Sequence, residues 1–168
     1  QLTPPVRESR HREALWRAIR DGVVDVIGSD HAPHTLDEKA RPYPDSPSGM
    51  TGVQTLLPIM LDHVHQGRLS LRRLVDLTSA GPARVFGIQG KGRIAVGDDA
   101  DFSIVDTAAR RTLDNAWIAS VAGWTPYHGE TVTGWPIHTV VRGRIVVRDE
   151  VLAPASPSGQ PVAFLETP

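Results

Sequence analysis

The 168-residue sequence predicts an α/β unit joined to a small β-sandwich. A helical pattern is followed by a short, nearly all-apolar run at 23–29, which is typical of a strand covered on both faces. Further helical patterns come next, and after Gly87 only short strand patterns between glycine-containing turns remain. We expect residues 1–87 to form the α/β part, 88–152 the β-sandwich and 153–168 a tail that packs only locally.

The first part contains three helical patterns and one long loop. Residues 2–6 include two adjacent prolines and are expected to form a strand end or a loop. Apolar residues recur at helical spacing in three segments, which are 8–20, 53–66 and 70–78. Ser70 is a suitable N-cap for the last helix, and Gly81-Pro82 is expected to break the chain after it. Residues 31–52 form the long loop, and loops of this length are usually functional or disordered.

The second part is expected to contain strands alone. Its short apolar runs are bounded by residues that favour turns, including Gly97 and Gly143. Four runs have the composition of strands: 93–96, 102–105, 138–141 and 145–147. We find no internal repeat in the sequence.

Composition excludes several classes of partner and site. The formal net charge of −1 gives no electrostatic reason to expect nucleic acid or an anionic membrane as a partner. Cysteine is absent, so any metal must be held by His, Asp or Glu. No apolar run approaches the length of a membrane span and no signal-peptide pattern is present, so we expect a cytoplasmic protein. We also expect a small-molecule substrate.

Asp30 and His34 most directly suggest a reactive site. Asp30 follows the apolar run at 23–29, and in α/β architectures ligands lie at the carboxyl ends of strands. Its carboxylate is expected to ligate a divalent cation, to act as a general base or to do both, while a capping role or an ion pair stays open. His34 follows four residues later, with Pro33 stiffening the connection. We expect its imidazole to reach the same pocket and donate a hydrogen bond to an anionic substrate group.

The other histidines are expected to have no direct role in chemistry. His31 should face away from Asp30 and serve as a packed residue. His63 and His65 lie two residues apart on a predicted helix, where such side chains diverge by about 200°, so we expect exposure to solvent rather than metal binding. His128 and His138 fall in the strand-rich part, and we assign no catalysis to them.

Residues 48–52 (Ser-Gly-Met-Thr-Gly) lead into the helix expected from Val53. Exposed backbone amides before a helix can bind an anion or a carbonyl oxygen, and glycines let the backbone approach a ligand closely. A glycine-rich entry into a helix is also an ordinary way to build a loop. Both interpretations stay open on spacing alone.

Several motifs resemble the dihydroorotases of the amidohydrolase superfamily. The central run is Ile-Gly-Ser-Asp-His-Ala-Pro-His-Thr at 27–35, followed by Asp-Glu-Lys at 37–39 and Pro-Ser-Gly-Met-Thr-Gly at 47–52. Further matching segments are 4–7, 82–87, 91–101, 124–127 and 134–136. The resemblance covers nearly the whole chain except the tail.

The resemblance implies the C-terminal portion of a (β/α)₈ TIM-type barrel with one or two zinc ions, followed by an accessory β-sandwich. The implied reaction is the reversible cyclisation of N-carbamoyl-L-aspartate to L-dihydroorotate in pyrimidine synthesis. Asp30 matches the aspartate that ligates a metal and transfers a proton between the hydrolytic water and the ring nitrogen. His34 matches the histidine that binds the substrate carboxylate, and Ser48 and Gly49 match a loop whose backbone contacts the ring.

The chain departs from the family pattern in two ways. Thr3 stands where many relatives have an asparagine that contacts substrate. The family's His-x-His strand, carboxylated lysine, two further metal histidines and substrate arginine would lie upstream, and neither Lys39 nor Lys91 lies on a barrel-strand motif. Because the chain also begins at Gln1, we expect a fragment or processed product that is inactive alone, with the remaining zinc ligands upstream.

Two alternatives to a dihydroorotase stay open. A hydantoinase or allantoinase is a related cyclic amidase, but those relatives usually have a different residue at the position of His34. A non-catalytic scaffold subunit would keep the fold without the metal centre. The resemblance also implies a homo-oligomer, with aspartate transcarbamoylase as a candidate partner.

Overall fold

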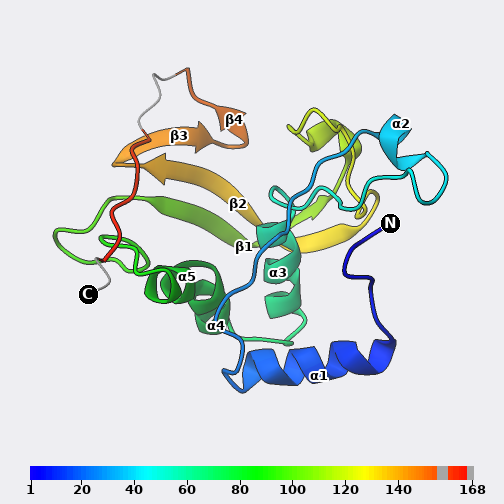
Figure 1. Ribbon diagram of the computed structural model, residues 1–168. Helices are drawn as coiled ribbons and strands as arrows, with labels where there is room; N and C mark the ends of the chain where they lie inside the picture. The colour runs from blue at the N-terminus through cyan, green and yellow to red at the C-terminus, as the bar shows by residue number, and fades with distance from the viewer. Residues whose placement is uncertain (155–158, 166–168) are drawn as a thin grey trace.

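The structure is a computed structural model that describes residues 1–154 and 159–165 (Figure 1). The helical elements are α1 (Ser9–Arg20), α2 (Leu36–Lys39), α3 (Leu56–His65), α4 (Leu71–Val75), the π-helical turn η1 (Asp76–Ala80), α5 (Gly81–Val85) and the 3₁₀ turn η2 (Asn115–Trp117). The strands are β1 (Phe102–Thr112), β2 (Thr131–Val141), β3 (Arg144–Arg148) and β4 (Val151–Leu152). No helix within the described ranges is long and apolar enough to cross a membrane.

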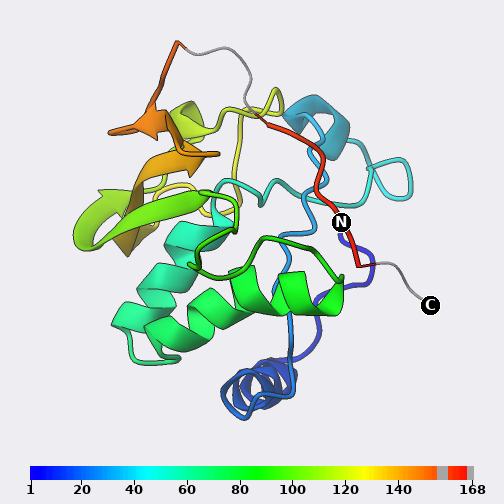
Figure 2. The ribbon, with the colours of Figure 1, turned by 90° about the vertical axis from the view of Figure 1, so that its left-hand side faces the viewer.

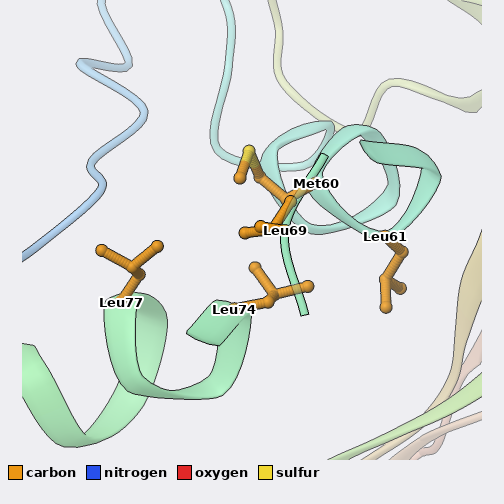
Figure 3. Close-up of a cluster of buried hydrophobic side chains, with 5 residues drawn as sticks. All are labelled: Met60, Leu61, Leu69, Leu74 and Leu77. Carbon is orange, nitrogen blue, oxygen red and sulfur yellow. The ribbon is translucent and has the colours of Figure 1, made fainter. Parts of the chain in front are cut away.

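The helices expected over 8–20 and 53–66 are present as α1 and α3, and they share one apolar core. Trp16 and Ile19 of α1 pack against buried side chains from α3 and the helical stretch after it. The buried centre consists of Met60, Leu61, Leu69, Leu74 and Leu77 (Figure 3). From the sheet outward, α3, α4 and α5 form a middle layer and α1 lies outermost (Figure 1, Figure 2).

The strand expected over 23–29 is wrong for the described chain, because this segment has no regular secondary structure. Val24 and Ile27 pack against the core, as their apolar side chains require. The Ile27 N–H donates to the carbonyl of Leu77 at 3.1 Å, so this amide bonds to the helical layer. A strand needs a neighbouring strand to complete its ladder of hydrogen bonds, and the described residues place none beside this segment.

The break expected at Gly81-Pro82 is also wrong, because α4, η1 and α5 form one helical stretch over 71–85. The N-cap is Ser70, as expected, and its hydroxyl accepts from the Arg73 N–H at 3.1 Å. Pro82 follows the π-turn η1, where the regular α-helical hydrogen bonding is already interrupted, so its missing N–H does not end the helix. Gly81 is required by close packing, because a Cβ there would lie 2.2 Å from the carbonyl oxygen of Asp25.

The four strands form one antiparallel sheet in the order β1-β2-β3-β4. The strands expected at 102–105, 138–141 and 145–147 are present, and each of them is part of a longer strand. Helix α3 packs on β2, where a Cβ at Gly134 would lie 2.5 Å from the Leu61 Cβ. A second apolar cluster consists of Leu113, Val132 and Trp135, and Ile59 of α3 packs against it.

The strand expected at 93–96 is wrong, because these residues lie in a turn-rich loop and Val96 is fully exposed. Charged contacts close this loop instead of strand pairing. Lys91 pairs with Asp99 at 2.8 Å and with Asp101, and the Arg142 N–H donates to Asp101 at 2.6 Å. Asp99 and Asp101 thereby tie the loop to Arg142 in the turn between β2 and β3.

The tail does not pack only locally. The Gln89 N–H donates to the Ala163 carbonyl at 2.9 Å, and the Leu165 N–H donates to the Gly87 carbonyl at 2.7 Å. Residues 163–165 therefore pair with 87–89, far away in the sequence. Residues 155–158 and 166–168 of the expected tail lie outside the described residues.

Candidate functional site

Residues 48–52 run beside residues 29–32, which places the glycine-rich loop next to Asp30. His31 and Met50 form a parallel bridge, and the Ala32 N–H donates to the Met50 carbonyl at 2.9 Å. Both glycines of the loop permit this approach. A Cβ at Gly49 would lie 2.4 Å from the Ala32 Cβ, and one at Gly52 would lie 2.8 Å from the Ser29 carbonyl oxygen.

Asp30 occupies a sharp turn at the start of the long loop. Its φ of 44° lies in the left-handed region, which aspartate tolerates better than most residues with a side chain. The residue is exposed to solvent. An exposed carboxylate on such a turn is open to a metal, a water molecule or a substrate that approaches this end of the molecule.

His31 is a packed residue, as the sequence predicted. It is half-buried, and its Nδ1 accepts from the Gly52 N–H at 3.0 Å and from the Val53 N–H at 3.4 Å. The imidazole therefore fixes the loop to the start of the segment that leads into α3. Because Nδ1 is occupied by these amides, this atom is not free to bind a metal.

His34 is held through both its backbone and its side chain. Its carbonyl accepts from the Trp124 indole Nε1–H at 2.7 Å, and its Nδ1 lies 3.8 Å from a Glu38 carboxylate oxygen. Glu38 and Thr35 form a capping box at the start of α2. The hydrogen bond from the Thr35 backbone N–H holds the pKa of Glu38 below its ordinary value, so an anion faces the His34 imidazole.

Lys39 brings the N-terminal segment to the glycine-rich loop. Its Nζ donates to the Gln1 carbonyl at 3.0 Å and to the Pro47 carbonyl at 2.8 Å. The Gly49 N–H also donates to the Gln1 carbonyl, at 3.2 Å. Thr3 is exposed two residues after this anchor, so the predicted positions Thr3, Ser48 and Gly49 share one region.

The segment after β1 closes the other side of the loop. The Thr51 hydroxyl donates to the Trp124 carbonyl at 2.6 Å. The Gln54 side chain donates to the Trp117 carbonyl at 2.7 Å and accepts from the Ala119 N–H at 2.8 Å. A pocket of about 280 Å³ lies between the two segments, lined by His31, residues 51–55 and residues 118–120.

Sequence reasoning missed Lys39, Trp124, Thr35 and Glu38 as residues that position this region. The capping box had a signal, because Thr-x-x-Glu is a known pattern at helix starts. Lys39 and Trp124 fall in the family-like segments 37–39 and 124–127, but no local pattern predicts their contacts, because each donates to a backbone carbonyl elsewhere in the chain.

The remaining histidines lie outside this region. His63 is half-buried with its ring edge-on to Trp16 at 4.7 Å, so its expected exposure is wrong, whereas His65 is exposed. Two residues apart on a helix, one side chain can reach the core while the other faces solvent. His128 and His138 accept backbone N–H bonds from Asn115 and Asp149 at 3.2 and 3.3 Å.

Comparison with known proteins identifies the family of the chain. Residues 6–146 match the profile of the amidohydrolase family. The chain belongs to the amidohydrolase family. The curated relatives of this amidohydrolase include a dihydroorotase of Halobacterium salinarum, 45% identical over 146 residues, which are 87% of this chain and 34% of the relative. A dihydroorotase of Pyrococcus furiosus is 39% identical over 150 residues, which are 89% of this chain and 34% of the relative.

Solved structures of other amidohydrolases share the α/β fold of this chain. An L-hydantoinase (dihydropyrimidinase) from Arthrobacter aurescens matches with a TM-score of 0.86 and 35% identity, covering 91% of this chain and 35% of that one. A dihydropyrimidinase from Brevibacillus agri matches with a TM-score of 0.85 and 32% identity, covering 90% and 34%. The chain thus spans about a third of the length of the relatives it matches.

The amidohydrolase family suggests a metal cofactor, and the donor set of this chain does not complete a site for one. Within residues 1–154 and 159–165, no group of three His, Cys, Asp or Glu side chains could hold an ion together. Asp30 presents an exposed carboxylate at the start of the long loop, while Nδ1 of His31 is occupied. These residues supply at most part of a metal centre.

Proposed function

We propose that this chain is part of a dihydroorotase, which interconverts L-dihydroorotate and N-carbamoyl-L-aspartate in pyrimidine synthesis. The convergence of residues 30–34, the loop 48–52 and the N-terminal segment is the observation that carries the proposal. The dihydroorotase names of several curated relatives, at 38–45% identity, support it.

Each predicted residue has a role in this proposal. Asp30 is the group that accepts a proton as water attacks the ring amide and returns it to the ring nitrogen, which its exposed position allows. His34 binds the carboxylate of the substrate, and the indole of Trp124 holds its backbone carbonyl at 2.7 Å. Ser48 and Gly49 offer backbone groups to the ring, and Thr3 takes the place of a substrate-binding asparagine.

The cofactor is part of the same proposal. Asp30 is one ligand of a zinc centre with one or two ions, and the other ligands come from protein outside these 168 residues. When bound, zinc would polarise the amide and lower the pKa of a water molecule. The described residues do not by themselves complete the metal site.

The wider architecture is proposed on the same family likeness. The helical part would be the end of a (β/α)₈ barrel, and the four-stranded sheet would belong to a β-sandwich. A homo-oligomer in the cytoplasm, with aspartate transcarbamoylase as a candidate partner, completes the proposal.

Two other functions have specific support and are tested together with the first. A hydantoinase is supported by the hydantoinase structures at 30–35% identity, and allantoinase is a further cyclic amidase to test. A scaffold without catalysis would be consistent with the incomplete set of metal donors.

The deciding experiment measures turnover by a longer protein that includes this chain, with dihydroorotate, hydantoin and allantoin as substrates. Dihydroorotate should be preferred, and Asp30→Asn should reduce kcat by about 10²–10⁴-fold because proton transfer is lost. His34→Gln should mainly raise KM for dihydroorotate, and His65→Gln, an exposed control, should change neither constant.

Metal analysis of the same protein should find zinc, whereas the 168-residue chain should bind no stoichiometric zinc and show no appreciable turnover. Preference for hydantoin would favour the hydantoinase, and a metal-free, inactive longer protein would favour the scaffold. Normal turnover by Asp30→Asn would contradict the role of Asp30.

A further inference from the structure

A hollow of about 640 Å³ lies far from the candidate site. Four arginines line it, together with Asp76 and the turn 67–70 that follows α3. The turn lies at the His65 end of α3, whereas the glycine-rich loop leads into the Leu56 end. We propose that this hollow, the arginine pocket, binds an oligophosphate group, either free or carried by a nucleotide.

The charge of the arginine pocket is not compensated from within the described chain. Arg73 pairs with Asp76, which Arg84 also approaches at 3.4 Å, so these charges offset one another. Arg20, Arg68 and Arg72 have no carboxylate within 4.0 Å among residues 1–154 and 159–165. Three uncompensated cations around one hollow are unexpected in a chain whose net charge is −1.

Helix stability does not account for this arrangement. Arg20 lies in the last turn of α1, where a cation offsets the helix dipole. Arg72 lies in the first turn of α4, where a cation is unfavourable and no acidic residue is present. The placement of Arg72 therefore costs the helix stability, and a bound anion would offset that cost.

The arginine pocket is also partly preorganised. The Arg73 side chain donates to the Ile19 carbonyl at 2.8 Å and to the Val24 carbonyl, which fixes the floor of the hollow to α1 and the segment after it. The Arg68 guanidinium lies 5.7 Å from the centre of the Trp16 ring, and this cation–π contact limits its freedom. Less conformational entropy is then lost when a ligand binds.

The lining selects the chemical class of the ligand. Each arginine guanidinium can bind two phosphate oxygens at once. Three arginines around one hollow therefore match a ligand with more than one anionic group. Leu69 is the one apolar side chain among the lining residues and is only 5% exposed, so the other side chains that line the hollow are polar or charged. The volume of the hollow lies in the range of small-molecule sites and is larger than a single phosphate would fill.

The test is calorimetric titration of the 168-residue chain with tripolyphosphate and with ATP. The triple variant Arg20→Gln, Arg68→Gln, Arg72→Gln removes the pocket charges. The triple variant Arg7→Gln, Arg10→Gln, Arg12→Gln removes the same charge from an exposed surface elsewhere. We expect the pocket variant to bind at least about tenfold more weakly, because each lost charged hydrogen bond weakens binding, and the control variant to bind like the wild type.

The proposal is supported whichever of the two anions binds more tightly. Tighter binding of tripolyphosphate would indicate a free oligophosphate as the ligand, and tighter binding of ATP would indicate a nucleotide. Equal weakening in both triple variants, equal affinity for sulfate, or tighter binding of a poly-glutamate peptide would overturn it. The single variant Arg72→Gln, on an exposed side chain, serves if the triple variant does not fold. No turnover is measured, so failure here leaves the proposed dihydroorotase function standing.

Discussion

His63 shows how one buried side chain can make the stability of the protein depend on pH. Its ring packs edge-on against Trp16, and its Nδ1 is buried without a hydrogen-bond partner among the described residues. Burial lowers the pKa of His63, and repulsion from Arg68 lowers it further. The unfolded chain therefore binds a proton more readily than the folded protein between the two pKa values, and stability must rise with pH across that range.

We expect the free energy of unfolding to fall as the pH is lowered from about 7.5 to 5, below the ordinary histidine pKa of about 6.5. His63→Gln should make this fall smaller, whereas the exposed control His65→Gln should leave it unchanged. Urea unfolding at a series of pH values measures both effects. An identical pH dependence in wild type and His63→Gln would show that another group is responsible.

At the scale of elements, the helical stretch over 71–85 depends on its contact with the segment before Asp30. The π-turn η1 places Leu77 in the core, where its side chain is 0% exposed. The backbone carbonyl of Leu77 accepts a hydrogen bond from the Ile27 N–H at 3.1 Å. At the end of this turn, Gly81 leaves room for the backbone of Asp25. Glycine is therefore needed at position 81 for close packing, and it does not end the helix.

Gly81→Ala should destabilise the protein by about 1–3 kcal/mol, because the new Cβ would overlap the backbone oxygens of Asp25 and Asp76. Gly28→Ala is the matched control, since a Cβ there meets nothing within 4 Å. Thermal and urea unfolding of both variants measure the difference. Equal stability of the two variants would mean that the contact relaxes without cost.

At the scale of the whole molecule, the segment between β1 and β2 ties the sheet to the candidate site. Trp124 bonds to His34 through its indole and to Thr51 through its carbonyl, and Gln54 bonds to both Trp117 and Ala119. The loop that carries Asp30 and His34 is therefore held between the helical layer and this segment. The sheet contributes to the site by positioning it.

Trp124→Phe should lower the free energy of unfolding by about 1 kcal/mol more than Trp117→Phe, because only Trp124 has an indole bond to a backbone carbonyl among the described contacts of the two side chains. Amide hydrogen exchange should become faster in residues 31–35 in the Trp124 variant alone. Equal exchange in both variants would show that the indole bond does not hold the loop.

The sequence by itself determined features that rest on local pattern. Apolar spacing predicted α1 and α3, Ser70 predicted the start of α4, and β-branched runs predicted parts of three strands. Motif spacing at 27–35 and 47–52 identified the family, and the roles of Asp30, His34, Ser48, Gly49 and Thr3 stay predictions.

Only the tertiary structure decided what depends on distant partners. The segment 23–29 has no strand beside it in the described chain, Gly81 and Pro82 continue a helix, and residues 91–101 close through ion pairs. Lys39, Trp124 and the arginine pocket also depend on contacts between residues far apart in the sequence. Local pattern reports the propensity of a segment and its apolar face, but the path of the chain decides which backbone groups and charges meet.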